Sequence, residues 1–417
     1  MIIGSEEQAA TRWLTGVRIV DVRTGRVSDP SSVGMRDGRI TAIQPGPPMA
    51  GAADIVDLAG RYLLPGLITC HVHLQGTYPY STRNPNEPPP WTALRAAARA
   101  RELRRRGFTT VRSVHELNRA DQHVRHAAEL GWTTAPRIFG AGRALTRPGG
   151  HGDGFGAVLA EGRAAFHDAA AAELEAGASH VKIFASGGLA RGGEALEQPE
   201  LSLGEMRGAV EAAAARGTYV VAHAAGSATI RVGLDAGVRS FEHAYLLDES
   251  TAAEMAKAGA FLTPTLVVTH AGDWMQTTGF DPAAIDRSTA LADTHLASIR
   301  RAIEAGVAIV HGTDIPSDGP SDGTMLAVRE LELLVDAGAS NLAALQSISL
   351  TAARLLGQEG ALGEISEGAA ADVVAMPADP TASVRALRMI DFVMHAGEVV
   401  RPIEGADETR HETADAR

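Results

Sequence analysis

One repeated pattern in the middle of the chain limits the folds that it can adopt. An alanine-rich segment with helical spacing ends at a glycine, and a short apolar segment follows at once. The pattern occurs seven times, at Gly107, Gly131, Gly177, Gly217, Gly237, Gly259 and Gly306. Glycine commonly ends helices because it adopts the left-handed conformation without steric cost. Helices that alternate with apolar strands are typical of a parallel sheet covered by helices.

With one further strand, these units predict a closed barrel. An apolar run at residues 65–71 precedes the first unit and completes a set of eight. Eight strand–helix units form a (β/α)8 TIM barrel, which we predict for residues 63–365. The segments on either side of the predicted barrel have a different pattern, because they contain short runs of β-branched residues between turn residues. We therefore predict a small β-sandwich domain formed by both chain ends, residues 1–62 together with 366–417.

Composition restricts the partners and the compartment of the chain. The 417 residues include 50 acidic residues against 38 Lys and Arg, so no nucleic-acid partner is expected. No apolar run is long enough to span a membrane, and the start MIIGSEEQAATRW lacks the regions of a secretory signal. A single cysteine, Cys70, excludes an intrachain disulfide. We expect a cytoplasmic protein that acts on a small molecule, and homo-oligomerisation is left open.

Histidines and an aspartate stand where the predicted barrel strands end. His71 and His73 end the first strand, and their spacing of two places them on one face. His223 ends the fifth strand, His243 ends the sixth, and Asp314 follows the eighth. A single such histidine would be weak evidence, but these strand ends meet at one mouth, where barrel active sites lie. Imidazole and carboxylate groups bind zinc and similar ions, so the sequence predicts a metal site there.

Lys182 lies in the middle of the predicted fourth strand, between apolar residues. The chain has one other lysine, Lys257. Burial of an unpaired ammonium group is costly, so this lysine calls for a physical explanation. One interpretation is a buried salt bridge. The other is an amine of lowered pKa that takes up CO2, giving a carbamate that bridges two metal ions. The scarcity of lysine favours the carbamate.

These residues lie in segments that resemble the amidohydrolase superfamily. The resemblance covers nearly the whole chain from about residue 14 to 400 and is most similar to the branch of Xaa-Pro and Xaa-Arg dipeptidases, ochratoxin-type amidases and imidazolonepropionase-related proteins. The segments that carry it are Leu63-Leu64-Pro65-Gly66-Leu67-Ile68-Thr69-Cys70-His71-Val72-His73-Leu74, 107–112, 181–188, 241–243, 311–314, 350–357, 363–365 and 371–374. One departure is Thr69, where the family often has an aspartate.

The resemblance implies two divalent metal ions, expected to be Zn2+. It assigns His71 and His73 to the buried ion and His223 and His243 to the exposed ion. Lys182 is implied as the bridging carbamate, and Asp314 as a metal ligand that shuttles the proton. In the implied mechanism a metal-bridging hydroxide attacks an amide carbonyl, and Asp314 returns the proton to the leaving nitrogen.

Three further residues are candidates for contacts with the substrate. His151 lies in a Gly-Gly-His-Gly-Asp loop similar to one in the same branch, and we expect it to polarise the scissile carbonyl. Tyr245, two residues after His243, could hold a substrate carboxylate, and Arg191 could pair with an anionic group. A purely structural role is the alternative for each of them. Substrate choice is expected to depend on the loops 75–91, 141–157, 189–199 and 266–282.

Three functions are compatible with the sequence. The leading hypothesis is a binuclear hydrolase of an amide bond in a dipeptide or an N-acyl amino acid. The second is a mononuclear cyclic-amide hydrolase, imidazolonepropionase-like, or a deaminase; these usually have a glutamate where this chain has Gly226, and they leave Lys182 unexplained. The third is a non-catalytic barrel scaffold, and the loss of metal-binding residues would be its signature. Metal content separates the three, at about two, one and no ions per chain.

Overall fold

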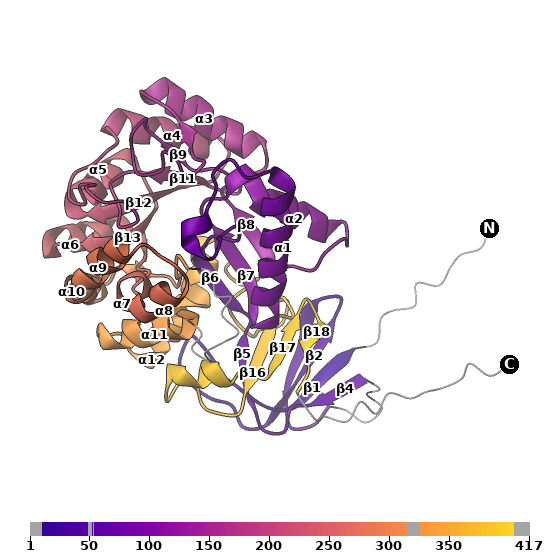
Figure 1. The fold of residues 1–417 in the computed structure, drawn as a ribbon. Coiled ribbons are helices and arrows are strands. Elements are labelled where there is room, and N and C mark those ends of the chain that lie inside the picture. The colour runs from indigo at the N-terminus through magenta and orange to yellow at the C-terminus, as the bar shows by residue number, and fades with distance from the viewer. Residues whose placement is uncertain (1–10, 49–51, 53, 316–325, 404–417) are drawn as a thin grey trace, which may run out of the picture.

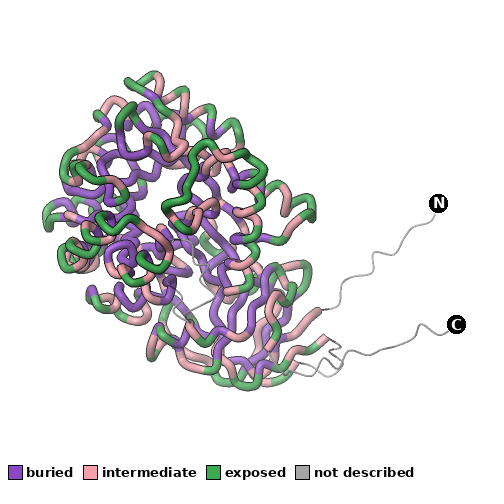
Figure 2. The backbone as a smooth tube through the Cα atoms, in the orientation of Figure 1, coloured by how far each residue is buried: buried purple, intermediate pink, exposed green. Residues whose placement is uncertain are grey.

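The computed structural model describes residues 11–48, 52, 54–315 and 326–403 (Figure 1). A barrel of strands and helices forms the larger part, and a strand-rich domain lies beside it. Both ends of the described chain belong to the strand-rich domain. Figure 2 shows that the buried segments follow the strands, whereas exposed residues lie on the outer helices and loops.

Eight parallel strands form the barrel wall in the order of the sequence, which confirms the predicted (β/α)8 barrel. Two ladders build the wall, β6 to β8 and β11 to β15. The Ser179 amide donates to the Gly140 carbonyl and joins the ladders, while the Cys70 amide donates to the His311 carbonyl and closes the barrel. The strands are β6 (Leu67–Val72), β7 (Phe108–Ser113), β8 (Arg137–Gly140), β11 (Val181–Phe184), β12 (Val220–Gly226), β13 (Ser240–Leu246), β14 (Phe261–Thr263) and β15 (Ala308–Ile309). The short strands β9 (Leu145–Thr146) and β10 (Val158–Leu159) extend the second ladder.

Helices surround the barrel, and each glycine of the repeated pattern ends one of them. All seven have positive φ, between 65° and 108°. The small alanine side chains let the helices approach the strands, and they fill much of the barrel core. The outer helices are α1 (Pro89–Arg105), α2 (Ala120–Glu129), α3 (Arg163–Glu175), α4 (Leu203–Ala215), α5 (Ser227–Ala236), α6 (Glu249–Ala258), α10 (Ala292–Glu304) and α11 (Leu326–Asp336), followed by α12 (Asn341–Ser347) and α13 (Leu350–Leu355).

Insertions over the strand ends shape the mouth of the barrel. The loop after β6 contains the short 3-10 helix η1 (Tyr80–Thr82), and the loop after β7 contains η2 (Leu117–Arg119). Three short helices follow β14, namely α7 (Val267–His270), α8 (Gly272–Thr277) and α9 (Pro282–Ala290). Within the described ranges, no helix combines the length and the apolar character needed to cross a bilayer.

The small domain is built from strands of both chain ends, as the sequence predicts. Most of β1 pairs with β2 and β4, and its last two residues, Arg18 and Ile19, pair with β5, so β1 links the two parts of the sheet. Apolar side chains from both chain ends, including Leu14, Val33, Val373 and Phe392, share one core. The strands are β1 (Arg12–Ile19), β2 (Ser31–Arg36), β3 (Arg39–Pro45), β4 (Asp54–Asp57), β5 (Tyr62–Pro65), β16 (Val373–Met376), β17 (Phe392–His395) and β18 (Glu398–Arg401), with the 3-10 helix η3 (Val384–Met389) before β17.

Gly66 connects the two parts of the molecule. It lies between β5 of the small domain and β6 of the barrel, and its amide donates to the Asp372 carbonyl. A Cβ at this position would collide with the side chain of Thr109. Only glycine therefore allows β6 to begin this close to the neighbouring strand.

Candidate active site

A cavity opens at the carboxyl ends of the barrel strands. All four loops expected to decide substrate choice contribute to its wall, through residues such as Tyr80, Phe155, Leu189 and Met275. Its titratable side chains include His71, His73, His115, His151, Lys182, His223, His243, Tyr245 and Asp314. The structure thus brings the predicted metal-binding residues to one place, together with two of the three expected substrate contacts.

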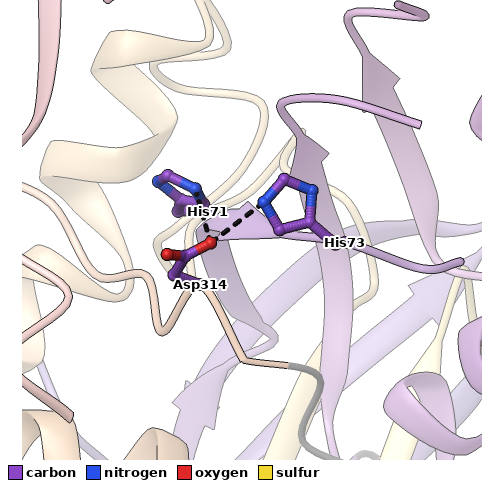
Figure 3. Close-up of side chains that lie close together, drawn as sticks. All are labelled: His71, His73 and Asp314. Carbon is purple, nitrogen blue, oxygen red and sulfur yellow. Dashed lines mark ion pairs between the residues drawn. The ribbon is translucent and has the colours of Figure 1, made fainter. Parts of the chain in front are cut away.

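His71, His73 and Asp314 form a compact group (Figure 3). His71 lies on β6 and His73 directly follows the strand, and both project to the same side, as their spacing of two predicts. Oδ1 of Asp314 lies 3.1 Å from Nε2 of His71 and 2.9 Å from Nε2 of His73. Among the described residues, these three form the group of histidine and acidic side chains whose ligand atoms lie close enough together to share a metal ion.

The outer nitrogens of the two histidines are held by other groups. Nδ1 of His73 lies 2.8 Å from the His115 carbonyl oxygen, which can only accept, so we assign the proton to Nδ1. Nδ1 of His71 lies 2.6 Å from Oε2 of Glu242. The inner Nε2 atoms of neutral rings then present lone pairs towards a carboxylate oxygen. Such an arrangement needs a positive charge between these atoms, so the group fits a bound cation.

Charge at this group is consistent with an ionised Asp314. Burial alone would raise the pKa of Asp314, but contacts with His71 and His73 in their protonated form outweigh it and hold that pKa well below its usual range. A cation bound between neutral rings and the carboxylate, in place of the ring protons, acts on the Asp314 pKa in the same direction. For His73, burial lowers the pKa of the imidazole, but the hydrogen bond and the charge of Asp314 raise it above its usual value. Asp314 therefore supplies a carboxylate, and not a carboxylic acid, at neutral pH.

His223 and His243 lie beside this group on the neighbouring strands β12 and β13. Their ring centroids are 4.5 Å apart, and the His243 ring is 5.1 Å from that of His71. Nδ1 of His243 bonds to Oγ1 of Thr265 at 2.7 Å, and Nε2 of His223 lies 3.1 Å from the Gly187 carbonyl oxygen. Burial lowers the pKa of both histidines well below the usual value, so both rings are neutral and carry a lone pair for a ligand.

Lys182 lies on β11 with its side chain almost wholly buried, and it lines the same cavity. Burial lowers its pKa to about 8, although the charges of Glu242 and Asp314 act in the opposite direction. No described carboxylate lies within ion-pair distance of its Nζ, which disfavours the buried salt bridge as an explanation. A neutral amine at the cavity is thus accessible near neutral pH.

His151 lies over the cavity on the loop after β9. Its ring stacks on His223 with centroids 4.6 Å apart. Nδ1 of His151 lies 2.5 Å from Oε2 of Glu194, and its backbone amide donates to Glu200 at 2.9 Å. Burial opposes ionisation of Glu194, but the hydrogen bond from His151 lowers the pKa of that carboxyl. A Cβ at position 188 would strike the ring, which explains Gly188.

The other two expected substrate contacts, Tyr245 and Arg191, differ in their position relative to the cavity. Tyr245 lines the cavity and stacks on His243 at a centroid distance of 5.2 Å. Arg191 is not among the residues that line the cavity. Its guanidinium donates to the carbonyl oxygens of Gly150 and Asp153 and thereby braces the loop that carries His151.

Glu242 and Arg112 belong to the site, although sequence reasoning gave them no role there. Nη2 of Arg112 lies 2.7 Å from Oε1 of Glu242, whose other oxygen holds His71. Glu242 precedes His243, and neighbours on a regular strand face opposite sides. Here His243 has a φ of 76° and Ala244 a φ of 55°, so the strand leaves regular geometry. Both side chains can thus face the site, and no signal in the local sequence predicts this.

Comparisons with known proteins agree with this geometry. The chain matches the model of the amidohydrolase family over residues 62–403.

The chain belongs to the amidohydrolase family.

Similar proteins extend over most of the amidohydrolase chain. The ochratoxinase of Aspergillus niger is 28% identical over 362 residues, which are 80% of this chain and 74% of that protein. A crystal structure of an amidohydrolase is 31% identical, with a TM-score of 0.86 over 94% of this chain and 99% of that one. A prolidase crystallised with N-methylphosphonate-L-proline is 28% identical, with a TM-score of 0.86 over 94% and 100%. The family resemblance is confirmed, and this amidohydrolase is a hydrolase that acts on C–N bonds.

Proposed function

We propose that this amidohydrolase is a binuclear metal-dependent enzyme that cleaves the amide bond of a dipeptide or an N-acyl amino acid. One observation carries the proposal: neutral histidines, an ionised aspartate and a lysine of lowered pKa line a single cavity. The names of its relatives support the bond type, since they include an ochratoxinase and a prolidase.

The residues divide into two sets of ligands around Lys182. His71 and His73 would hold one ion and His223 and His243 the other, with Asp314 as a further ligand. Lys182, as a carbamate, would offer one oxygen to each ion. Bound divalent ions, Zn2+ in this proposal, lower the pKa of water towards neutrality and so supply a nucleophile at physiological pH.

Two side chains are proposed to handle protons and charge in the reaction. Asp314 is ionised, so it can accept a proton from water and give it to the leaving nitrogen. Glu194 holds Nδ1 of His151, which leaves Nε2 for the substrate. When the ring carries both protons, Nε2 donates to the scissile carbonyl oxygen and stabilises the charge that develops there. Tyr245, beside His243, is proposed to contact the substrate.

The structure at Gly226 counts against the mononuclear alternatives. Gly226 is the residue before α5, at the place where those enzymes usually have a glutamate. A Cβ at this position would lie 3.0 Å from Cα of Glu197, so a larger side chain would displace the backbone of that loop. Lys182 also has no role in a mononuclear site.

Metal analysis together with a substrate screen tests the proposal. Protein reconstituted with zinc and bicarbonate is assayed against dipeptides and N-acyl amino acids, and its metal content is measured by elemental analysis. We expect about two ions per chain and release of a free amino acid. Asp314→Asn should abolish turnover with an unchanged circular dichroism spectrum. One ion per chain would favour a mononuclear enzyme, and no metal with no hydrolysis would favour a scaffold.

A further inference from the structure

The loop after β6 holds an arginine over the mouth of the cavity. Arg83 directly follows η1, is exposed to solvent and is one of the lining residues. Its guanidinium carbon lies 3.9 Å from the centre of the Phe155 ring, which belongs to the loop after β9. Nη1 donates to the Tyr80 hydroxyl at 3.2 Å. Two loops from different strands thus fix the position of this cation.

The described residues leave the charge of Arg83 without a carboxylate partner. No carboxylate of the described residues lies within ion-pair distance of it. Arg95, which also lines the cavity, is paired with Glu87 at 2.5 Å. Arg191 is held by backbone carbonyls and lies 3.8 Å from Glu194. Arg83 therefore differs from the neighbouring arginines, because its planar donor group is positioned but has no anionic partner among the described residues.

Negative and positive side chains occupy different parts of the described cavity wall. Asp314 is the one carboxylate among the described lining residues, and its Oδ1 faces His71 and His73 at the floor. At the mouth, Arg83 adds positive charge with no acidic neighbour in the lining. An anionic group on a substrate is attracted to such a site, and a cationic group is repelled.

Another part of the wall is apolar and is connected to the arginine. Tyr80, which accepts from Arg83, stacks on Phe280 with centroids 4.2 Å apart and planes 6° apart. Further apolar lining comes from Leu189, Val268, Met275 and Ile315. A substrate that places an anion on Arg83 can therefore bury an uncharged side chain against the same wall.

We propose that Arg83 binds the free carboxylate of the substrate and that the enzyme prefers amino acids with apolar side chains on the leaving side of the amide. This inference rests on the amide hydrolysis proposed above. In an N-acyl amino acid the carboxylate is one carbon from the scissile nitrogen, so anchoring it orients the amide bond over the cavity floor. Arg83 takes the anion-binding role for which the sequence suggested Arg191.

Matched substrates test this role by kinetics. N-acetyl-L-phenylalanine and N-(2-phenylethyl)acetamide contain the same amide and phenyl group, but only the first has a carboxylate. A hydrogen-bonded charge is worth about 1.5–3 kcal/mol, which is roughly 10- to 100-fold in a rate or binding constant. Arg83→Met, which keeps an apolar stem on Phe155, should lower the ratio of kcat/KM for the two substrates by this factor. Arg101→Met, an exposed change on α1, should leave the ratio unchanged.

A binding measurement separates this inference from the proposed reaction. We expect 3-phenylpropionate to bind the zinc-loaded enzyme more tightly than 3-phenylpropionamide in calorimetry, with the difference reduced about tenfold or more in Arg83→Met. We also expect N-acetyl-L-arginine to be a poor substrate. An unchanged substrate ratio and an unchanged binding difference in Arg83→Met would overturn the inference while hydrolysis remains. Absence of all hydrolysis with Arg83-dependent carboxylate binding would instead reject the proposed reaction and keep the anion site.

Discussion

At the scale of single residues, the site depends on groups whose charge state is set by burial. Lys182, His223 and His243 all have lowered pKa values because burial disfavours their charged forms, whereas Asp314 remains ionised beside its two histidines. Neutral nitrogens and one carboxylate are the states that bind metal ions. The same side chains on an exposed surface would be protonated lysine and partly protonated histidine, and would bind metals less well.

Lys182→Ala should lose both proposed metal ions and activity, because it removes the carbamate oxygens that are proposed to bridge them. A short carboxylic acid added to this variant should restore part of both. Lys182→Arg should not restore them, since a guanidinium stays charged and cannot form a carbamate. Metal analysis and turnover measure these effects. An unmodified Nζ in the crystal structure of an active enzyme with its metals bound would contradict the carbamate.

His151→Asn should lower kcat by roughly 10²–10³, the range for loss of one donor to a developing oxyanion. Its metal content should be unchanged, since His151 is proposed to contact the substrate and not the ions. Steady-state kinetics with parallel elemental analysis is the measurement. Turnover close to that of the unaltered enzyme would remove His151 from the catalytic residues.

At the scale of elements, irregular backbone aims the side chains at the strand ends. Thr265 follows β14 with a φ of 55°, an unfavourable value for a β-branched residue, and its hydroxyl holds His243. The next two amides, of Leu266 and Val267, each donate to the buried carboxyl of Glu330 on α11 at 2.9 Å. Glu330 thereby holds the turn that carries Thr265, so α11 contributes to the position of His243.

Glu330→Gln should destabilise the fold by about 1–3 kcal/mol, because an NH2 group replaces one acceptor and leaves a buried amide without a partner. Urea denaturation measures the loss, and the zinc affinity of the variant should fall with it. Glu254→Gln, an exposed change on α6, is the matched control and should alter stability by no more than about 0.5 kcal/mol. Equal stability of the two variants would show that Glu330 does not hold the turn.

At the scale of the whole molecule, both chain ends meet in one domain that packs against the barrel. An ion pair connects the two parts, since Arg137 of β8 contacts the buried carboxylate of Asp372, next to β16. The other Asp372 oxygen accepts the Ala396 amide at 2.7 Å. Removal of either chain end would therefore expose the core shared by β1, β5 and β16, as well as the adjoining end of the barrel.

Arg137→Met should lower the free energy of unfolding by about 1–3 kcal/mol, because it leaves the buried Asp372 carboxylate without its cationic partner. The arginine side chain is one-third exposed, so water compensates for part of the loss and the effect stays below that of a fully buried pair. Thermal unfolding followed by circular dichroism gives the shift. Arg137→Lys, which retains the charge, should recover part of the lost stability. An unchanged unfolding midpoint in Arg137→Met would show that the contact is not stabilising.

The sequence by itself determined the barrel, the small domain and the mouth where the metal-binding candidates gather. The glycines that end the helices and the histidines at the strand ends are local features of the sequence. Parallel strands of a barrel bring their carboxyl ends together independently of the loop sequences. Tertiary structure alone decided that Glu242 joins the site beside His243 and that Glu194 holds His151. It also decided that Arg83, and not Arg191, lines the cavity without a carboxylate partner in the described part of the chain. Each depends on irregular backbone or on contacts between residues far apart in the chain, for which periodicity and spacing carry no signal.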